Sequence, residues 1–181
     1  MLVEPRTDRL LLRQWRDSDL APWAAMNADP EVREHFPSLL THEQSAAVLT
    51  RNQDEIGRRG YGWWAVEVVA TGEFIGFTGL NPVEGMPFTG VEIGWRLARS
   101  AWGHGYATEA ALACLTFGFE TLELPEIVAM ATTTNLRSHA VMRRIGMTRD
   151  PDADFDHPNV PDGPLRRHVL YRIRRSTTPS C

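Results

Sequence analysis

The sequence predicts a mixed α/β fold in which a mostly antiparallel sheet is flanked by helices. Three observations support this prediction: runs with apolar residues at alternate positions, segments with an amphipathic 3.6-residue repeat, and the order in which these alternate along the chain. An antiparallel meander leads into a strand–helix–strand–helix series. We expect one domain over residues 1–175, with about six to seven strands and about four helices, and a disordered tail over residues 176–181.

In the first half of the chain, extended runs alternate with helical patterns. Asp17 and Asp19 are candidate N-caps for one helix, and Thr41 and Gln44 have the capping-box spacing that predicts the start of another. The elements expected here are a strand at 9–15, helices at 17–26 and 41–57, and paired strands at 63–69 and 73–80.

The second half repeats a strand–helix unit before two closing strands. Gly146 is a natural left-handed stop for the helix that precedes it. Residues 150–164 are acidic and proline-rich, which predicts a loop. The elements expected here are strands at 91–98, 127–132, 147–149 and 165–173, and helices at 107–119 and 136–145.

A glycine-rich turn over residues 102–107 joins the strand at 91–98 to the next helix. Gly103 and Gly105 let backbone N–H groups face outward together, and the helix adds its unpaired first-turn donors and the positive end of its dipole. Such a turn binds phosphate oxygens through the main chain. A bare G-x-G is more often only a tight turn, so the interpretation needs support from other residues.

The composition excludes several classes of function. All nineteen basic residues are Arg, so a P-loop, a pyridoxal phosphate enzyme and a protein kinase, which each need a lysine, are not expected. The net charge of -4 gives no electrostatic footprint for nucleic acid, and no apolar run is long enough to span a membrane. Because a signal-peptide pattern and cysteine motifs are absent too, we expect a cytoplasmic protein.

Two alternative kinds of site have little support. A dinucleotide-binding turn requires glycine or alanine where Thr108 stands, and an acid after the next strand, where residues 131–135 contain none. The alternating acids of residues 150–156 would make an EF-hand only with Gly and Glu in place of Phe155 and Pro161. The six histidines are scattered, so no metal is expected.

Glu92 is a candidate general base. It shares one face of the strand at 91–98 with Gly94 and Arg96. A glycine in mid-strand commonly marks a bulge or the close approach of another backbone, and a carboxylate beside such a gap can act as a base if burial raises its pKa. The alternative, which periodicity alone favours, is an exposed acid or one paired with Arg96.

Several ordered segments resemble the GCN5-related N-acetyltransferase (GNAT) family, in the form of its RimJ/RimL ribosomal-protein acetyltransferase branch. The turn and the start of its helix, Trp-Gly-His-Gly-Tyr-Ala-Thr-Glu-Ala, are similar to motif A of the family. Four further segments are similar to elements of the branch. Residues 7–13 resemble its opening strand, 92–97 its central strand, 135–147 its Asn-x-x-Ser helix with the strand after it, and 165–172 its last strand. The resemblance covers nearly the whole chain and implies a sheet that is splayed at its centre.

The same resemblance implies an N-acetyltransferase that binds acetyl-CoA at the splayed centre and uses no metal. The turn would hold the pyrophosphate, the backbone near Leu97 would pair with the pantetheine, and Asn135 would contact the cofactor from the far side. The implied cofactor-binding residues are Leu97, Trp102, Gly103, His104, Gly105, Tyr106, Ala107, Thr108, Asn135 and Ser138.

The chemistry that the resemblance implies is direct attack of a neutral amine on the thioester. Glu92 would remove the ammonium proton through water, a backbone N–H near Leu97 would polarise the carbonyl, and Ser138 would be the acid toward the thiolate. The residues alone also allow Ser138 to be a first-turn helix residue after Asn135, a good N-cap.

Two positions depart from the family pattern. Trp102 stands where the broad family often has Arg or Gln, which removes a cation and leaves main-chain donors to bind the phosphates. Met142 stands where many relatives have a tyrosine acid, which leaves Ser138 as the candidate.

The acceptor is expected to be a primary amine, first of all a protein N-terminus. The alternatives are a small-molecule amine, such as a polyamine, an aminoglycoside or an amino-acid-like compound, and a sensor that binds acyl-CoA without turnover. The loops at 27–40 and 150–164 are the expected walls of the acceptor groove, and their acids favour a cationic acceptor. Whether the protein forms a homodimer is left open.

Overall fold

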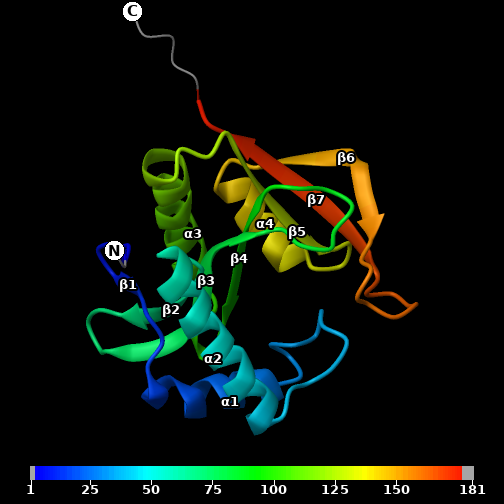
Figure 1. The fold of residues 1–181 in the computed structure, drawn as a ribbon. Helices are drawn as coiled ribbons and strands as arrows, with labels where there is room; N and C mark the ends of the chain where they lie inside the picture. Colours follow the sequence, from blue (N-terminus) through cyan, green and yellow to red (C-terminus); the bar gives the residue numbers. More distant parts are fainter. Residues whose placement is uncertain (1–2, 177–181) are drawn as a thin grey trace, which may run out of the picture.

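The structure, a computed structural model, describes residues 3–176 and contains a seven-stranded sheet with four α-helices (Figure 1). The strand order is β1-β2-β3-β4-β5-β7-β6, in which β4 and β5 are parallel and the other neighbours antiparallel. The strands are β1 (Leu10–Arg13), β2 (Trp63–Val68), β3 (Glu73–Pro82), β4 (Val91–Leu97), β5 (Glu126–Thr132), β6 (Thr148–Asp156) and β7 (Arg167–Arg174). The helices are α1 (Leu20–Ala28), α2 (His42–Arg59), α3 (Tyr106–Thr116) and α4 (Leu136–Arg144). The predicted fold class is confirmed.

Of the expected disordered tail, residues 177–181 lie outside the described residues. Within residues 3–176, none of the helices combines the length and the hydropathy that crossing a bilayer requires.

Helices cover both faces of the sheet. On β3, the ring of Phe77 lies 5.8 Å from that of Trp23 on α1, whereas the Thr78 hydroxyl lies 3.9 Å from the thiol of Cys114 on α3. Successive residues of a strand point to opposite faces, so α1, with α2 packed on it, covers one face and α3 the other. Helix α4 packs against β5 and α3.

The limits of α2 follow from local chemistry. The Thr41 hydroxyl accepts from the Gln44 N–H (3.1 Å), and the Gln44 side chain accepts from the Thr41 N–H (2.8 Å), so the predicted capping box is confirmed. The helix continues beyond the expected end at Gly57 and stops at Gly60, whose φ of 81° is left-handed. Glycine adopts that conformation at no steric cost, whereas Gly57 is simply helical.

Strand β6 corrects the prediction of an acidic loop over residues 150–164. Residues up to Asp156 pair with β7, with a register shift between Asp150 and Phe155. An edge strand tolerates a proline and a bulge, because only one side of it must pair. Asp150 bonds Arg172 of β7 at 2.8 Å and Asp156 bonds Arg167 at 3.3 Å, so arginines of the neighbouring strand offset two of the acids that suggested a loop.

The centre of the sheet is splayed, as predicted. Strands β4 and β5 are in register at one pair of residues, Glu92 and Val128. Beyond this pair the ends of the two strands part, and the adjacent backbone edges are left for other partners.

Of the two features that a mid-strand glycine commonly marks, a bulge is absent at Gly94, because the register of β3 and β4 is continuous there and Gly94 pairs with Gly79. A Cβ atom at Gly94 would lie 2.9 Å from the ring of Trp63. The close approach is therefore made by an aromatic side chain from β2 rather than by a backbone.

Candidate active site

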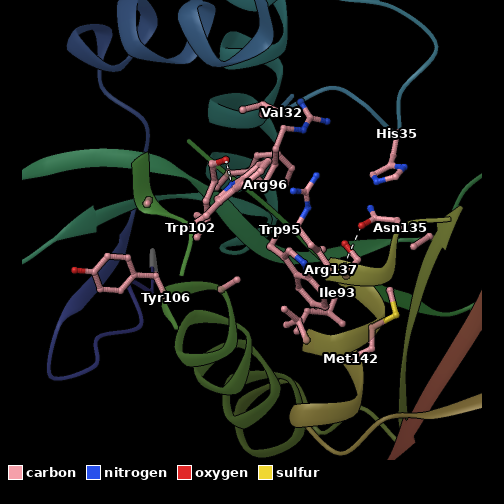
Figure 2. A pocket seen from close by; sticks show the side chains of 18 of the residues that line it. Val32, His35, Ile93, Trp95, Arg96, Trp102, Tyr106, Asn135, Arg137 and Met142 are labelled. Atoms are coloured by element: carbon pink, nitrogen blue, oxygen red, sulfur yellow. Dashed lines mark hydrogen bonds between the residues drawn. The ribbon is translucent and has the colours of Figure 1, made fainter. Parts of the chain in front are cut away.

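A cavity of about 1200 Å³ lies where β4 and β5 part (Figure 2). Its "turn side" holds most of the predicted site: Leu97, Trp102, Gly103, Gly105, Tyr106, Ala107, Thr108, Asn135 and Ser138. Its "α1 side" is lined by Trp23, Val32, Arg33, His35, Phe36, Asn52, Trp63, Phe77 and Arg96. Glu92 lines the cavity too, whereas His104 does not: its ring stacks on Tyr106 and its Nδ1 lies 2.9 Å from the Trp102 carbonyl oxygen.

The glycine turn has the geometry of an anion-binding site. Both glycines are left-handed, with φ of 82° at Gly103 and 79° at Gly105. Gly105 is the N-cap of α3, and no side chain caps this helix, so its first-turn N–H groups are left for a ligand. A Cβ atom at Gly103 would have no protein atom within 4 Å, which leaves room for one. The turn therefore fits a pyrophosphate group.

Arg9 is a cation at this turn that the sequence analysis missed. Its guanidinium lies 4.8 Å from the centre of the Tyr106 ring and donates to the His104 carbonyl oxygen (3.1 Å). Burial alone would raise the pKa of Glu109, but hydrogen bonds from Thr7 and Arg9 lower this pKa overall. Glu109 is thus ionised and holds Arg9 beside the turn.

Trp102 brings two more cations to the same place. Its ring lies 4.9 Å from the guanidinium of Arg99 and 4.3 Å from that of Arg137, and its indole N–H donates to the Leu97 carbonyl oxygen (3.0 Å). The departure from Arg or Gln at this position therefore still leaves arginines near the turn, although Arg99 is paired with Glu31 and Arg137 with Glu34. That main-chain donors bind the phosphates stays a prediction.

The backbone of Leu97 faces the gap between β4 and β5. The Ala98 N–H donates to the Ile75 carbonyl oxygen of the segment that pairs with β4 (2.8 Å). The N–H groups of successive residues in a strand point alternately to its two neighbours, so the Leu97 N–H points away from β3 and toward β5. Because β5 has parted from β4 there, this N–H suits a carbonyl oxygen bound in the gap.

Glu92 is half-buried at the position where β4 and β5 are paired. Burial raises the pKa of its carboxyl group to about 7. Within the described residues, Arg96 bonds Asn27 instead of Glu92, so neither an exposed nor an Arg96-paired acid is found. A carboxyl group with this pKa is poised to exchange a proton near neutral pH.

Helix α4 places three further residues of interest on the cavity wall. The Asn135 side chain accepts from the Ser138 N–H (3.1 Å), so the N-cap that local sequence predicted is present. Met142 is buried and has no proton to donate (Figure 2). Ser138 is therefore the hydroxyl of this helix that lines the cavity.

The raised pKa of Glu92 has a consequence for stability. Between pH 4.5 and about 7 the folded protein keeps a proton that the unfolded chain releases, so this group lowers stability as pH rises. We expect Glu92→Gln to remove this loss. Between pH 5 and pH 8.5 the free energy of unfolding of the variant should therefore rise, relative to that of the wild type, by at most about 3 kcal/mol. Urea unfolding of both proteins at several pH values measures this difference. Glu73→Gln, at an exposed position of β3, is the control. Parallel curves for wild type and Glu92→Gln would contradict the buried carboxyl group.

Comparison with known proteins places the chain in a family. The acetyltransferase (GNAT) domain family matches residues 9–148. The chain is 36% identical to the uncharacterized protein YkkB of Bacillus subtilis, over 78% of this chain and 83% of that one. It is 33% identical to FsC-acetyl coenzyme A-N(2)-transacetylase of Aspergillus fumigatus, over 83% of this chain and 67% of that one.

Solved structures share the fold. An acetyltransferase from Agrobacterium tumefaciens, 30% identical, matches with a TM-score of 0.78 over 97% of this chain and 96% of that one. RimJ from Mycobacterium smegmatis, solved in complex with CoA-disulfide, has a TM-score of 0.74 over 94% of this chain and 84% of that one, at 22% identity. The chain belongs to the GNAT acetyltransferase family, whose acetyl donor is acetyl-CoA.

Proposed function

We propose that this protein transfers the acetyl group of acetyl-CoA directly to a primary amine, with a protein N-terminal amine as the leading acceptor. The observation that carries the proposal is the half-buried carboxyl group of Glu92, with a pKa of about 7, in the same cavity as the phosphate-binding turn. The RimJ/RimL-like motifs of the sequence support the choice of a protein N-terminus. A cytoplasmic location and the question of a homodimer stay predictions.

Acetyl-CoA fits the turn side of the cavity. Gly103, Gly105 and the first-turn amides of α3 would hold the pyrophosphate, with Arg9 supplying positive charge. The Leu97 backbone would pair with the pantetheine arm, and Asn135 would contact it from α4. When bound, acetyl-CoA supplies the activated thioester from which the acetyl group is transferred.

Three groups of the protein move or stabilise charge in the proposed reaction. Glu92 takes the proton of the incoming ammonium group through water, since only the neutral amine has a free lone pair. The Leu97 N–H donates to the carbonyl oxygen on which negative charge develops. The Ser138 hydroxyl is the candidate donor of a proton to the departing sulfur.

A small-molecule acceptor is the second candidate. The name of the Aspergillus fumigatus relative specifies transfer to a nitrogen of one named compound, FsC, which supports this alternative. A sensor that binds acyl-CoA without turnover has less support, because it would have no use for a half-buried carboxyl group of raised pKa.

An acceptor screen tests the proposal. The protein is incubated with acetyl-CoA and a panel of N-terminal peptides, polyamines, aminoglycosides and amino acids; released thiol is measured and products are identified by mass spectrometry. Acetylation of peptide N-termini supports the leading proposal, and acetylation of small amines alone supports the second. Binding of acetyl-CoA without turnover on any amine would instead favour the sensor.

A further inference from the structure

The α1 side of the cavity contains two arginines that no carboxylate of residues 3–176 pairs with. Arg33 is 8% exposed, and Arg96 lies half-buried in the same wall. Burial and the nearby charge of Arg33 lower the pKa of Arg96 to about 9, and burial lowers that of Arg33. Both guanidinium groups are still charged at neutral pH, so the wall carries uncompensated positive charge in a site of low dielectric constant.

Neutral groups fix the position of these two guanidinium groups. The Asn27 side-chain oxygen accepts from Arg96 Nη1 (3.0 Å) and from Arg33 Nη1 (3.5 Å). Asn27 is fully buried, and its amide nitrogen donates to the Ser45 hydroxyl of α2 (3.1 Å), which sets the direction of its oxygen. The packing of α1 on α2 thus positions both arginines without neutralising them.

Aromatic rings surround Arg96. Its guanidinium carbon lies 4.1 Å from the centre of the Phe36 ring, 5.4 Å from Phe77 and 5.6 Å from Trp23. Such contacts use the face of the charged group and no hydrogen bonds, so they leave its N–H groups as donors, and arginine can bind carboxylates and phosphates through two of these at once.

Two buried polar atoms of this region have no hydrogen-bond partner among the described residues. They are Nε of Arg96 and the side-chain oxygen of Asn52, and Asn52 is only 2% exposed. Both residues line the cavity. A buried polar group without a partner is costly unless a ligand satisfies it, so these atoms mark the α1 side as a polar subsite.

The acids of the neighbouring loop are bound elsewhere. Glu31, which lines the cavity, pairs with Arg99, and the exposed Glu34 pairs with Arg137. Three acids of β6, Asp150, Asp154 and Asp156, pair with arginines as well, and this region contributes His157 rather than a carboxylate to the cavity. Both acids of this loop are thus offset by arginines, whereas Arg33 is buried in the cavity wall without a carboxylate partner among residues 3–176. The cationic acceptor expected from these acids stays a prediction, and the proposal below is its alternative.

From these observations we propose that the acceptor is an amine that also carries an anionic group, a carboxylate or a phosphate, which Arg96 and Arg33 bind while Glu92 deprotonates the amine. Glu92 and Arg96 are four residues apart on one face of β4, which is about 13 Å along the strand. The amine and the anionic group are thus separated by up to this length, as in a short acidic peptide. This inference rests on the proposed acetyl transfer.

Matched acceptors that differ only in the anionic group test the proposal. The pairs are the peptide amides Ser-Ala-Glu and Ser-Ala-Gln, the peptide amides Ser-Ala-phosphoserine and Ser-Ala-Ser, and 8-aminooctanoate with its amide. We expect wild-type kcat/KM to favour the anionic member of at least one pair by tenfold or more, and the three pairs distinguish peptide carboxylate, phosphate and small-molecule carboxylate. Equal rates within every pair would overturn the anionic subsite and leave acetyl transfer intact, whereas no product from any amine would count against the proposed function itself.

Variants of Arg96 show whether it acts on specificity or only on folding. Arg96→Met should abolish the preference for the anionic member of a pair, and Arg96→Lys, which keeps the positive charge, should retain part of it. A general structural defect would instead slow both members of the pair equally. Arg58→Met, on the exposed side of α2, is the control and should keep the wild-type ratio. As a readout without turnover, the anionic member should raise the melting temperature of the free wild-type protein more than its neutral partner does. A wild-type preference that survives in Arg96→Met would overturn the role of Arg96.

Discussion

Replacing Glu92 by Gln is expected to lower kcat at pH 7 by about 10²- to 10⁴-fold, the range over which a positioned general base contributes. Glutamine keeps the size of the side chain and cannot accept the ammonium proton. Since the pKa of Glu92 is about 7 in the free protein, wild-type kcat/KM should rise with pH and level off above pH 7. This ionisation should be missing from the profile of the variant.

The measurement is steady-state thiol release across pH 5.5–9, with acetyl-CoA affinity determined by calorimetry. The affinity for acetyl-CoA should change little, because Glu92 lies apart from the turn proposed to hold the phosphates. Glu73→Gln, at an exposed position, should behave as wild type in both assays. Wild-type rates for Glu92→Gln over this pH range would contradict the assignment of Glu92 as the general base.

Gly103→Ala is expected to weaken acetyl-CoA binding by about tenfold or more, which corresponds to 1.4 kcal/mol or more. In the free protein a Cβ atom at Gly103 meets no atom within 4 Å, so the methyl group occupies only the space into which the N–H groups of the turn face. It would prevent the close approach of a phosphate to the backbone. Gly105→Val should have a similar or larger effect, because Gly105 is also left-handed and is the N-cap of α3.

A matched glycine separates this effect from backbone strain. Gly72, in the turn between β2 and β3, has a φ of 70° and likewise no atom within 4 Å of an added Cβ. Both Gly72→Ala and Gly103→Ala should lose about 1 kcal/mol of stability, since alanine is strained in the left-handed region. Only Gly103→Ala should lose affinity in calorimetry. Unchanged binding in Gly103→Ala and Gly105→Val would refute the role of the turn.

Most elements could be predicted because their signals are local. The capping box of Thr41 and Gln44, the left-handed stop at Gly146 and the glycine turn before α3 each depend on a few neighbouring residues. The start of β6 was expected at 147–149, but its continuation to Asp156 was missed for the opposite reason. The acids of this stretch look like a loop by themselves and become compatible with a strand only when arginines of β7 lie beside them.

The site divides in the same way. The phosphate-binding turn and the candidate base were visible as a motif and as an acid on an apolar strand. Periodicity could not decide whether Glu92 was exposed, because its burial depends on how the strands are arranged around it. Arg9 shows the same limit: it reaches the turn from a segment almost one hundred residues away, held by Glu109. No local pattern reports such a contact.

The sequence by itself determined the α/β class, the order of elements, the glycine turn proposed to bind phosphates and the family to which these motifs are similar. These properties follow from residue spacing and from the conformational demands of glycine and capping residues. Only the tertiary structure decided the electrostatics of the acceptor's side of the cavity. Charge there depends on which side chains pair: Glu31 and Glu34 pair with arginines, while Arg33 and Arg96 meet the neutral Asn27 amide, the Ser38 carbonyl oxygen and aromatic rings. The composition is that of an acidic protein, and folding places two arginines without carboxylate partners in the same cavity as the candidate base.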